Sequence, residues 1–147
     1  MDFINIMSNA PTDVGQLAVN VDRFVRRLHA SLHGRAQQVD AEKIGPFGGM
    51  VLMCVSELQP ISMHALTAHL ARDKSQMTRV VASLEHKGLV ERRRSETDGR
   101  VTVIALTEAG SAQVGAFERV LTDVVEDLLD GWSPDEVTAF ARLIAKI

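Results

Sequence analysis

Residues 61–110 carry the pattern that most constrains the fold of this chain. Two short helical repeats of apolar residues are joined by a tight polar connection. Two strand-like runs separated by a polar, Arg-rich tip follow, and then another helical pattern begins. This order of elements, two helices joined by a turn and then two strands joined by a tip, is typical of a winged helix-turn-helix. The sequence therefore predicts a mostly helical α+β domain with a small β-hairpin.

Capping residues mark where the two short helices begin. Ser62 can cap the first helix, because its side-chain oxygen can accept from the free backbone N–H groups of the first turn. The apolar pattern breaks at Arg72-Asp73-Lys74, and Asp73 is a good N-cap for a second helix. Gln76, three residues later, can complete a capping-box-like exchange. The second helix is then expected to bury a stripe at helical spacing, formed by Met77, Val80, Val81 and Leu84.

The opposite face of this second helix is polar. It carries Ser75, Gln76, Arg79, Ser83 and His86, with Thr78 at the edge of the stripe. Short polar side chains and an arginine near the N-terminus of a helix can reach base edges and phosphates in the major groove of DNA. An ordinary solvated face is the alternative, and this helix alone does not decide between the two.

The two strand-like runs indicate a hairpin with a cationic arm. Residues 89–94 include three consecutive arginines, Ser95 to Gly99 has the composition of a turn, and residues 100–106 form a second β-rich run. Arg100 lies near the tip of this hairpin. A protruding ribbon could place that side chain in a minor groove, which is narrow and electronegative in A·T tracts.

A set of short motifs runs through this segment. They are Leu70-Ala71, Ser75 with Thr78-Arg79, Leu84-Glu85 with Gly88-Leu89-Val90, Asp98 with Arg100, and Leu106-Thr107 with Gly110. In their order and spacing, over roughly a third of the chain, they resemble the MarR family of bacterial transcriptional regulators. The resemblance implies a dimeric repressor that binds a pseudo-palindromic operator in double-stranded DNA and is released by a small effector, aromatic or phenolic by family analogy.

The resemblance also implies roles for individual residues. Asp98 would stabilise the wing by pairing with a strand arginine. The residues expected to contact DNA are Ser75, Gln76, Thr78, Arg79, Ser83, Arg92, Arg94 and Arg100, the last in the minor groove. Ala82 and Ser83 stand where many members carry larger polar or charged residues, so base readout here is expected to use fewer side chains.

Long amphipathic patterns flank the winged segment and indicate a homodimer. In residues 13–42 the apolar residues recur at helical spacing, and in residues 108–147 two further helices do the same. The last stripe reaches Ile147, although chain ends in a monomer usually fray in water. In the MarR family the first, fifth and sixth helices build the dimer interface. The alternative is that the first helix covers the core of its own subunit.

We therefore expect a single domain over residues 1–147, with a winged helix-turn-helix core at 45–106. Gly45-Pro46 opens the buried helix behind that core. The N-terminus has no signal-peptide pattern and no apolar run is long enough to span a bilayer, so the sequence predicts a bacterial cytoplasmic protein that does not associate with membranes.

Charge is unevenly distributed along the chain. The net charge is −3, yet residues 60–110 hold eight Lys and Arg against six Asp and Glu, whereas residues 111–147 hold three against seven. The cations thus gather in the segment expected to bind DNA. The acidic C-terminal region keeps open an alternative from another class, a winged-helix module that binds protein instead of DNA.

Other chemistry finds weaker support. Cys54, the single cysteine, invites a thiol-sensor interpretation, but it lies among apolar residues. His29 and His33 have a spacing that could place two imidazoles on one metal, but two ligands alone do not make a metal site. We expect a structural cysteine, no metal and no cofactor, with a thiol- or metal-responsive regulator as the alternative.

No phosphate loop, nucleophile elbow or HExxH is present, so no enzyme is expected. Candidate effector-pocket walls, each also explicable as core, are Phe24, Phe47, Met50, Phe117 and Trp132.

Overall fold

The computed structural model describes residues 13–147 as helices and a small sheet. In chain order the elements are α1 (Val14–Val39), α2 (Gly45–Leu58), β1 (Ile61–Ser62), α3 (Met63–His69), α4 (Lys74–His86), β2 (Val90–Arg94), β3 (Thr102–Leu106), α5 (Glu108–Leu128) and α6 (Pro134–Ile144). This order confirms the predicted mostly helical winged helix-turn-helix. The predicted single domain extends back to residue 1, and its first twelve residues lie outside the described part.

Side-chain caps fix where the helices begin. The Ser62 hydroxyl accepts from the backbone N–H of Ala65, and the Thr107 hydroxyl accepts from that of Gly110. Ser133 and Glu136 form a reciprocal capping box at the start of α6, as their spacing predicts. At α4 the Asp73 carboxylate accepts from the N–H of Ser75, which replaces the expected exchange with Gln76.

The sheet has three antiparallel strands in the order β1-β3-β2, one more than the sequence predicted. β2 and β3 form the expected hairpin, with Val90 opposite Leu106 and Arg94 opposite Thr102. The additional strand, Ile61–Ser62, pairs with β3 through Ile61 and Ile104. Two residues are too few to show the alternation that identifies a strand, and Ser62 was identified from the sequence only as the N-cap of the following helix.

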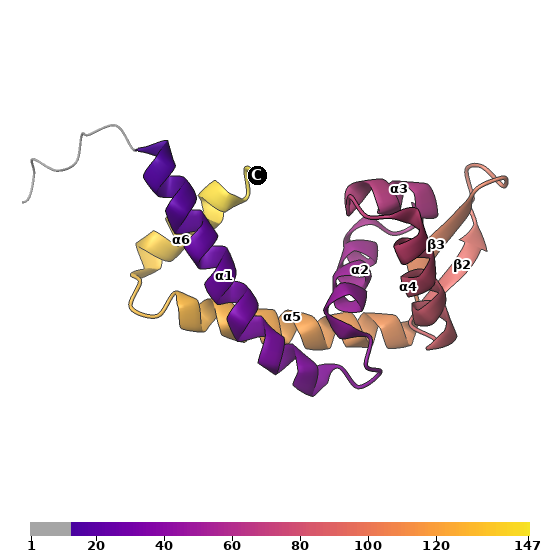
Figure 1. Ribbon diagram of the computed structural model, residues 1–147, viewed down its shortest axis with the longest axis horizontal. Helices are drawn as coiled ribbons and strands as arrows, with labels where there is room; N and C mark the ends of the chain where they lie inside the picture. The colour runs from indigo at the N-terminus through magenta and orange to yellow at the C-terminus, as the bar shows by residue number, and fades with distance from the viewer. Residues whose placement is uncertain (1–12) are drawn as a thin grey trace, which may run out of the picture.

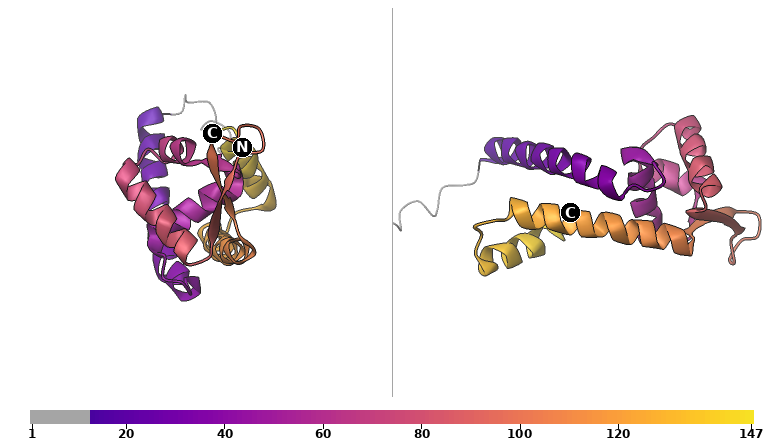
Figure 2. Two further views of the ribbon diagram at one scale, coloured as in Figure 1. Left: turned by 90° about the vertical axis from the view of Figure 1, so that its right-hand side faces the viewer. Right: turned by 90° about the horizontal axis from the view of Figure 1, so that it is seen from below.

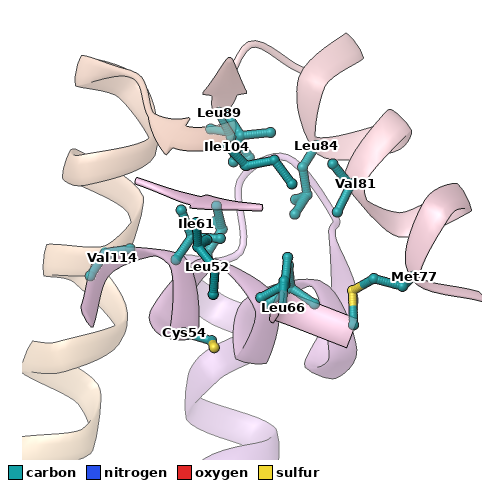
Figure 3. Packing of buried hydrophobic residues seen from close by; sticks show 13 residues of the cluster. Leu52, Cys54, Ile61, Leu66, Met77, Val81, Leu84, Leu89, Ile104 and Val114 are labelled. Atoms are coloured by element: carbon teal, nitrogen blue, oxygen red, sulfur yellow. The ribbon is translucent and has the colours of Figure 1, made fainter. Parts of the chain in front are cut away.

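The core lies between α2, α3, α4 and the sheet (Figure 3). Met77, Val81 and Leu84 of α4 are buried as their spacing predicts, whereas Val80 is only partly buried. They meet Leu66 of α3 and Ile104 of β3, which are also buried. α2 contributes Val51, Leu52, Cys54 and Val55, and so forms the buried helix behind the winged module.

The molecule is elongated and has two lobes (Figures 1 and 2). The winged lobe contains α2, α3, α4 and the sheet, and the β2–β3 hairpin projects from its outer end. The scaffold lobe contains α1, α6 and the distal part of α5, and α5 runs continuously between the two lobes. None of the helices between residues 13 and 147 combines the length and apolarity that crossing a bilayer requires.

Edge-to-face aromatic contacts and an ion pair hold the scaffold lobe together. The Phe140 ring of α6 lies 5.9 Å from the Phe24 ring of α1 and 5.5 Å from the Trp132 ring, between centroids. Arg35 of α1 pairs with Asp127 of α5 at 2.5 Å. Even so, neither α1 nor α6 contains a buried residue, so both helices leave apolar side chains exposed.

Candidate nucleic-acid interface

The polar face of α4 is exposed along its length. Packing of Met77, Val81 and Leu84 into the core turns the opposite side of the helix outward. The residues predicted from sequence to contact DNA on this helix are placed accordingly: Ser75, Thr78, Arg79 and Ser83 are exposed and Gln76 is partly exposed. The Thr78 hydroxyl donates to the carbonyl of Lys74, so it leaves only acceptor capacity for a ligand.

Hydrogen bonds within its tip give the wing a defined loop. The Asp98 carboxylate accepts from the backbone N–H of Arg100 at 3.1 Å, and Arg94 donates to the carbonyl of Gly99 at 2.8 Å. The expected pairing of Asp98 with a strand arginine is therefore replaced by these main-chain contacts. The backbone of Arg100 is held while its side chain remains exposed. Such a residue can extend into a groove without the loop having to reorganise.

An ion pair joins the wing to α4. The Nε of Arg92 in β2 lies 2.6 Å from a carboxylate oxygen of Glu85 in α4, and both side chains are partly exposed. Arg92 was predicted to contact DNA, and in this structure it spans the two elements that carry the remaining predicted contacts. Arg79 and Arg100 form no ion pair with any other described residue. Their charges are thus available to an external anion.

Two cations near these elements were not selected from the sequence. Lys74 is exposed in the first turn of α4, where backbone N–H groups also favour anions. Arg93 is exposed on β2 and, because strand residues alternate, points to the face opposite Arg92 and Arg94. Both stand beside predicted contacts in the sequence, and their exposed charge is the signal that could have identified them.

A cavity of about 780 Å³ lies between α1, α2 and α5. Its apolar wall includes Leu32, Met50, Met53, Phe117, Val120 and Leu121, and its polar wall includes His29, His33, Gln37, Asp40 and Lys43. Of the predicted pocket walls, only Met50 and Phe117 line it. Phe24 and Trp132 instead pack on Phe140, and the Phe47 ring lies under the Arg72 guanidinium at 5.1 Å. Aromatic residue type did not distinguish pocket walls from core.

The two histidines and the cysteine considered for sensing chemistry have different environments, a cavity wall and the core. His29 and His33 both line the cavity, and His33 is within hydrogen-bond distance of Gln37. Among residues 13–147 no group of three His, Cys, Asp or Glu side chains is arranged to hold a metal ion. Cys54 is buried, and its burial, with a smaller contribution from the nearby Glu57 carboxylate, raises the pKa of the thiol. A raised pKa disfavours the reactive thiolate.

Comparisons with known proteins agree with this geometry. Residues 49–102 match the model of the MarR family. A Bacillus subtilis (strain 168) protein named uncharacterized HTH-type transcriptional regulator YxaD is 28% identical over 98 residues, which cover 67% of this chain and 68% of that protein. Wild-type MarR from E. coli in its apo form superposes with a TM-score of 0.68 at 25% identity, covering 93% of this chain and 98% of that one. A mutant MarR from E. coli complexed with operator DNA has a TM-score of 0.61 at 22% identity, with 92% and 98% covered.

Proposed function

We propose that the chain, which is similar to the MarR family of transcriptional regulators in sequence and fold, is a homodimeric repressor of bacterial transcription. In this proposal it binds a pseudo-palindromic operator in double-stranded DNA, in the cytoplasm, and a small molecule releases it. As a transcriptional regulator the protein is not an enzyme.

The observation that carries the proposal is the placement of α4 beside the wing. The exposed face of α4 bears Arg79, the exposed tip of the wing bears Arg100, and the Glu85–Arg92 ion pair links the two elements. A helix and a ribbon side by side suit a major groove and the adjacent minor groove. The similar MarR structure from E. coli that holds operator DNA supports this use of the fold. α4 is therefore called the recognition helix below.

The exposed apolar face of the scaffold lobe supports a homodimer. Large apolar side chains are exposed on α1 at Val14, Leu17, Val19, Val21 and Val25, and at the C-terminal end of the chain at Val137, Leu143, Ile144 and Ile147. Monomers rarely leave so many apolar residues together in water. Two copies joined through this surface would present two recognition helices. They would read half-sites about 10 bp apart, or a multiple of that spacing.

The cavity between α1, α2 and α5 supports an effector. Its volume of about 780 Å³ lies within the range of small-molecule sites, roughly 300–1,000 Å³. Apolar walls with a few polar groups suit an amphipathic compound, and we infer an aromatic or phenolic one. It would bind where the scaffold lobe meets the winged lobe, so it could change how the two are oriented.

Two measurements test the proposal. One is a mobility shift with DNA from around the gene at about 50 mM and 200 mM salt, and the other is the oligomeric state in solution. We expect a dimer that binds DNA and whose affinity falls steeply with salt, because each neutralised phosphate contributes nearly one to the log–log slope. A dimer that binds no double-stranded DNA even at the lower salt would instead favour the protein-binding alternative. A monomer would contradict the proposal outright.

A further inference from the structure

The loop between α1 and α2, residues 40–44, is a compact turn at the junction of the two lobes. The Asp40 carboxylate accepts from the backbone N–H groups of Ile44 and Gly45, each at 2.9 Å, and the Lys43 N–H donates to the Asp40 carbonyl. Lys43 has a φ of +52°, in the left-handed region. These bonds close the loop on itself, so we expect it to move as one unit.

One side chain of the recognition helix binds this loop. The Nζ of Lys87, the C-cap of α4, donates to the carbonyl of Glu42 at 2.5 Å and to that of Lys43 at 3.3 Å. Hydrogen bonds from an ammonium group are roughly twice as strong as neutral ones. The partners are 45 and 44 residues away in sequence, so the contact joins the C-terminal end of the recognition helix to the loop that follows α1.

The same loop and its flanks form part of the cavity wall. Asp40, Lys43, Gly45 and Pro46 all line the cavity, whereas no residue of α4 does. A molecule in the cavity would therefore contact the loop directly and reach α4 through other groups. Between residues 13 and 147, Lys87 forms the side-chain hydrogen bonds that link this loop to the recognition helix. The cavity also reaches α4 through the apolar packing of α2 against it and through α5, whose Thr107 hydroxyl donates to the Gly88 carbonyl.

We propose that Lys87 is the positioning residue through which the α1–α2–α5 cavity acts on the recognition helix. This inference rests on the proposed function, because it assigns α4 to DNA. Displacement of the Glu42 and Lys43 carbonyls would pull on the Lys87 ammonium group and reorient the end of α4. The apolar core beneath α4 would stay intact, because the contact lies outside it.

A double-mutant cycle tests the inference without knowledge of the effector. Ala36 lines the cavity one helical turn before the loop, so Ala36→Phe fills the cavity from within. Lys87→Met removes the donor while keeping an unbranched side chain. With Lys87 present, we expect Ala36→Phe to change the dissociation constant for DNA at least about 5-fold. In the Lys87→Met background, which lacks the donor, the same change should be under about 2-fold.

Two matched variants control for charge and for structure. Lys87→Arg keeps donors that can reach the carbonyls and should restore most of the coupling. Lys74→Met removes a positive charge from the same helix but no contact with the loop, so it should weaken DNA binding while leaving the effect of Ala36→Phe unchanged. Additive effects of Ala36→Phe and Lys87→Met, or no effect of Ala36→Phe in either background, would overturn the inference.

A second readout needs no DNA and separates this inference from the proposed function. We expect Ala36→Phe to change hydrogen exchange at the backbone amides of Lys87 and Gly88 in the presence of Lys87, and to leave it unchanged in Lys87→Met. If the protein bound no DNA but showed this pattern, only the proposed function would fail. If the protein bound DNA and Ala36→Phe left hydrogen exchange at these amides unchanged in both backgrounds, only the inference would fail.

Discussion

Gly110, in the first turn of α5, lies so close to Leu89 that a Cβ on the glycine would stand 1.9 Å from the Leu89 carbonyl oxygen. That carbonyl accepts from the N–H of Thr107, and the Thr107 hydroxyl donates to the carbonyl of Gly88. The start of α5 is thus fixed directly on the residues that end the recognition helix. Because the obstruction is backbone, no side chain can be accommodated here by a change of rotamer.

Gly110→Ala should therefore destabilise the protein. We expect a loss of about 1–3 kcal/mol in the free energy of unfolding, the usual cost of overpacking, measured by urea denaturation. Gly34→Ala is the matched control, since Gly34 lies inside α1 with nothing within 4 Å of an added Cβ. It should stabilise by about 0.5–1 kcal/mol. Equal stability of the two variants would contradict the close approach.

The N-cap of the recognition helix gives a second prediction. The Asp73 carboxylate accepts from the Ser75 N–H at 2.6 Å, so Asp73→Ala leaves a helix-terminal N–H without its partner. We expect a loss of about 0.5–2 kcal/mol in the free energy of unfolding, while Asp73→Ser should recover most of it. Thermal denaturation followed by circular dichroism provides the measurement. A wild-type melting temperature for Asp73→Ala would show that the cap is dispensable.

Sequence patterns predicted the helices and the exposed face of α4 because both depend on local spacing. Met77, Val81 and Leu84 point inward simply because residues three and four apart share one face of a helix, and this leaves Arg79 outside. Caps such as Ser133 and Thr107 are equally local. Asp98, although close in sequence to the strand arginines, binds backbone instead, a choice set by the shape of the loop.

Contacts across the fold could not be predicted in this way. β1 exists because β3 offers it a pairing edge, and the pattern of two residues carries no such information. Met50 and Phe117 line one cavity while Phe24 and Trp132 do not, which depends on how α1, α5 and α6 cross. The bond from Lys87 to the α1–α2 loop likewise joins residues 45 apart in the chain.

The buried thiol of Cys54 gives a prediction about pH. Burial raises its pKa, so the folded state holds the thiol proton more tightly than the unfolded state does. This contribution to stability is complete below the ordinary thiol pKa and is lost as the pH rises from that value through the higher folded one. We expect Cys54→Ala to lose less stability than wild type between about pH 8 and 10, in urea denaturation. An identical pH dependence would contradict it. A thiol reagent should also react slowly with the native protein.

The exposed end of α6 gives a prediction about assembly. Ile144 is 48% exposed in the isolated chain, so a charged residue there costs the subunit little but would be buried in the proposed dimer. We expect Ile144→Glu to sediment as a folded monomer and to bind DNA weakly. Ala65→Glu adds the same charge at an exposed site in the winged lobe and should remain a dimer. A dimer of Ile144→Glu as stable as wild type would place the interface elsewhere.

Arg79 and Arg100 should make separable contributions to DNA binding. Arg100→Ala should weaken operator binding by about 1 kcal/mol or more and reduce its dependence on A·T-rich flanks, since a narrow minor groove attracts the lost guanidinium. Arg79→Ala should weaken binding by about 1–3 kcal/mol and relax discrimination within the half-site, because the lost guanidinium is assigned to a base edge in the major groove. Mobility shifts on operator variants with altered flanks or altered half-sites distinguish the two. Each substitution that removes a phosphate contact should also lower the salt slope by close to one. If both variants bound every DNA as wild type does, neither arginine would have the role assigned to it.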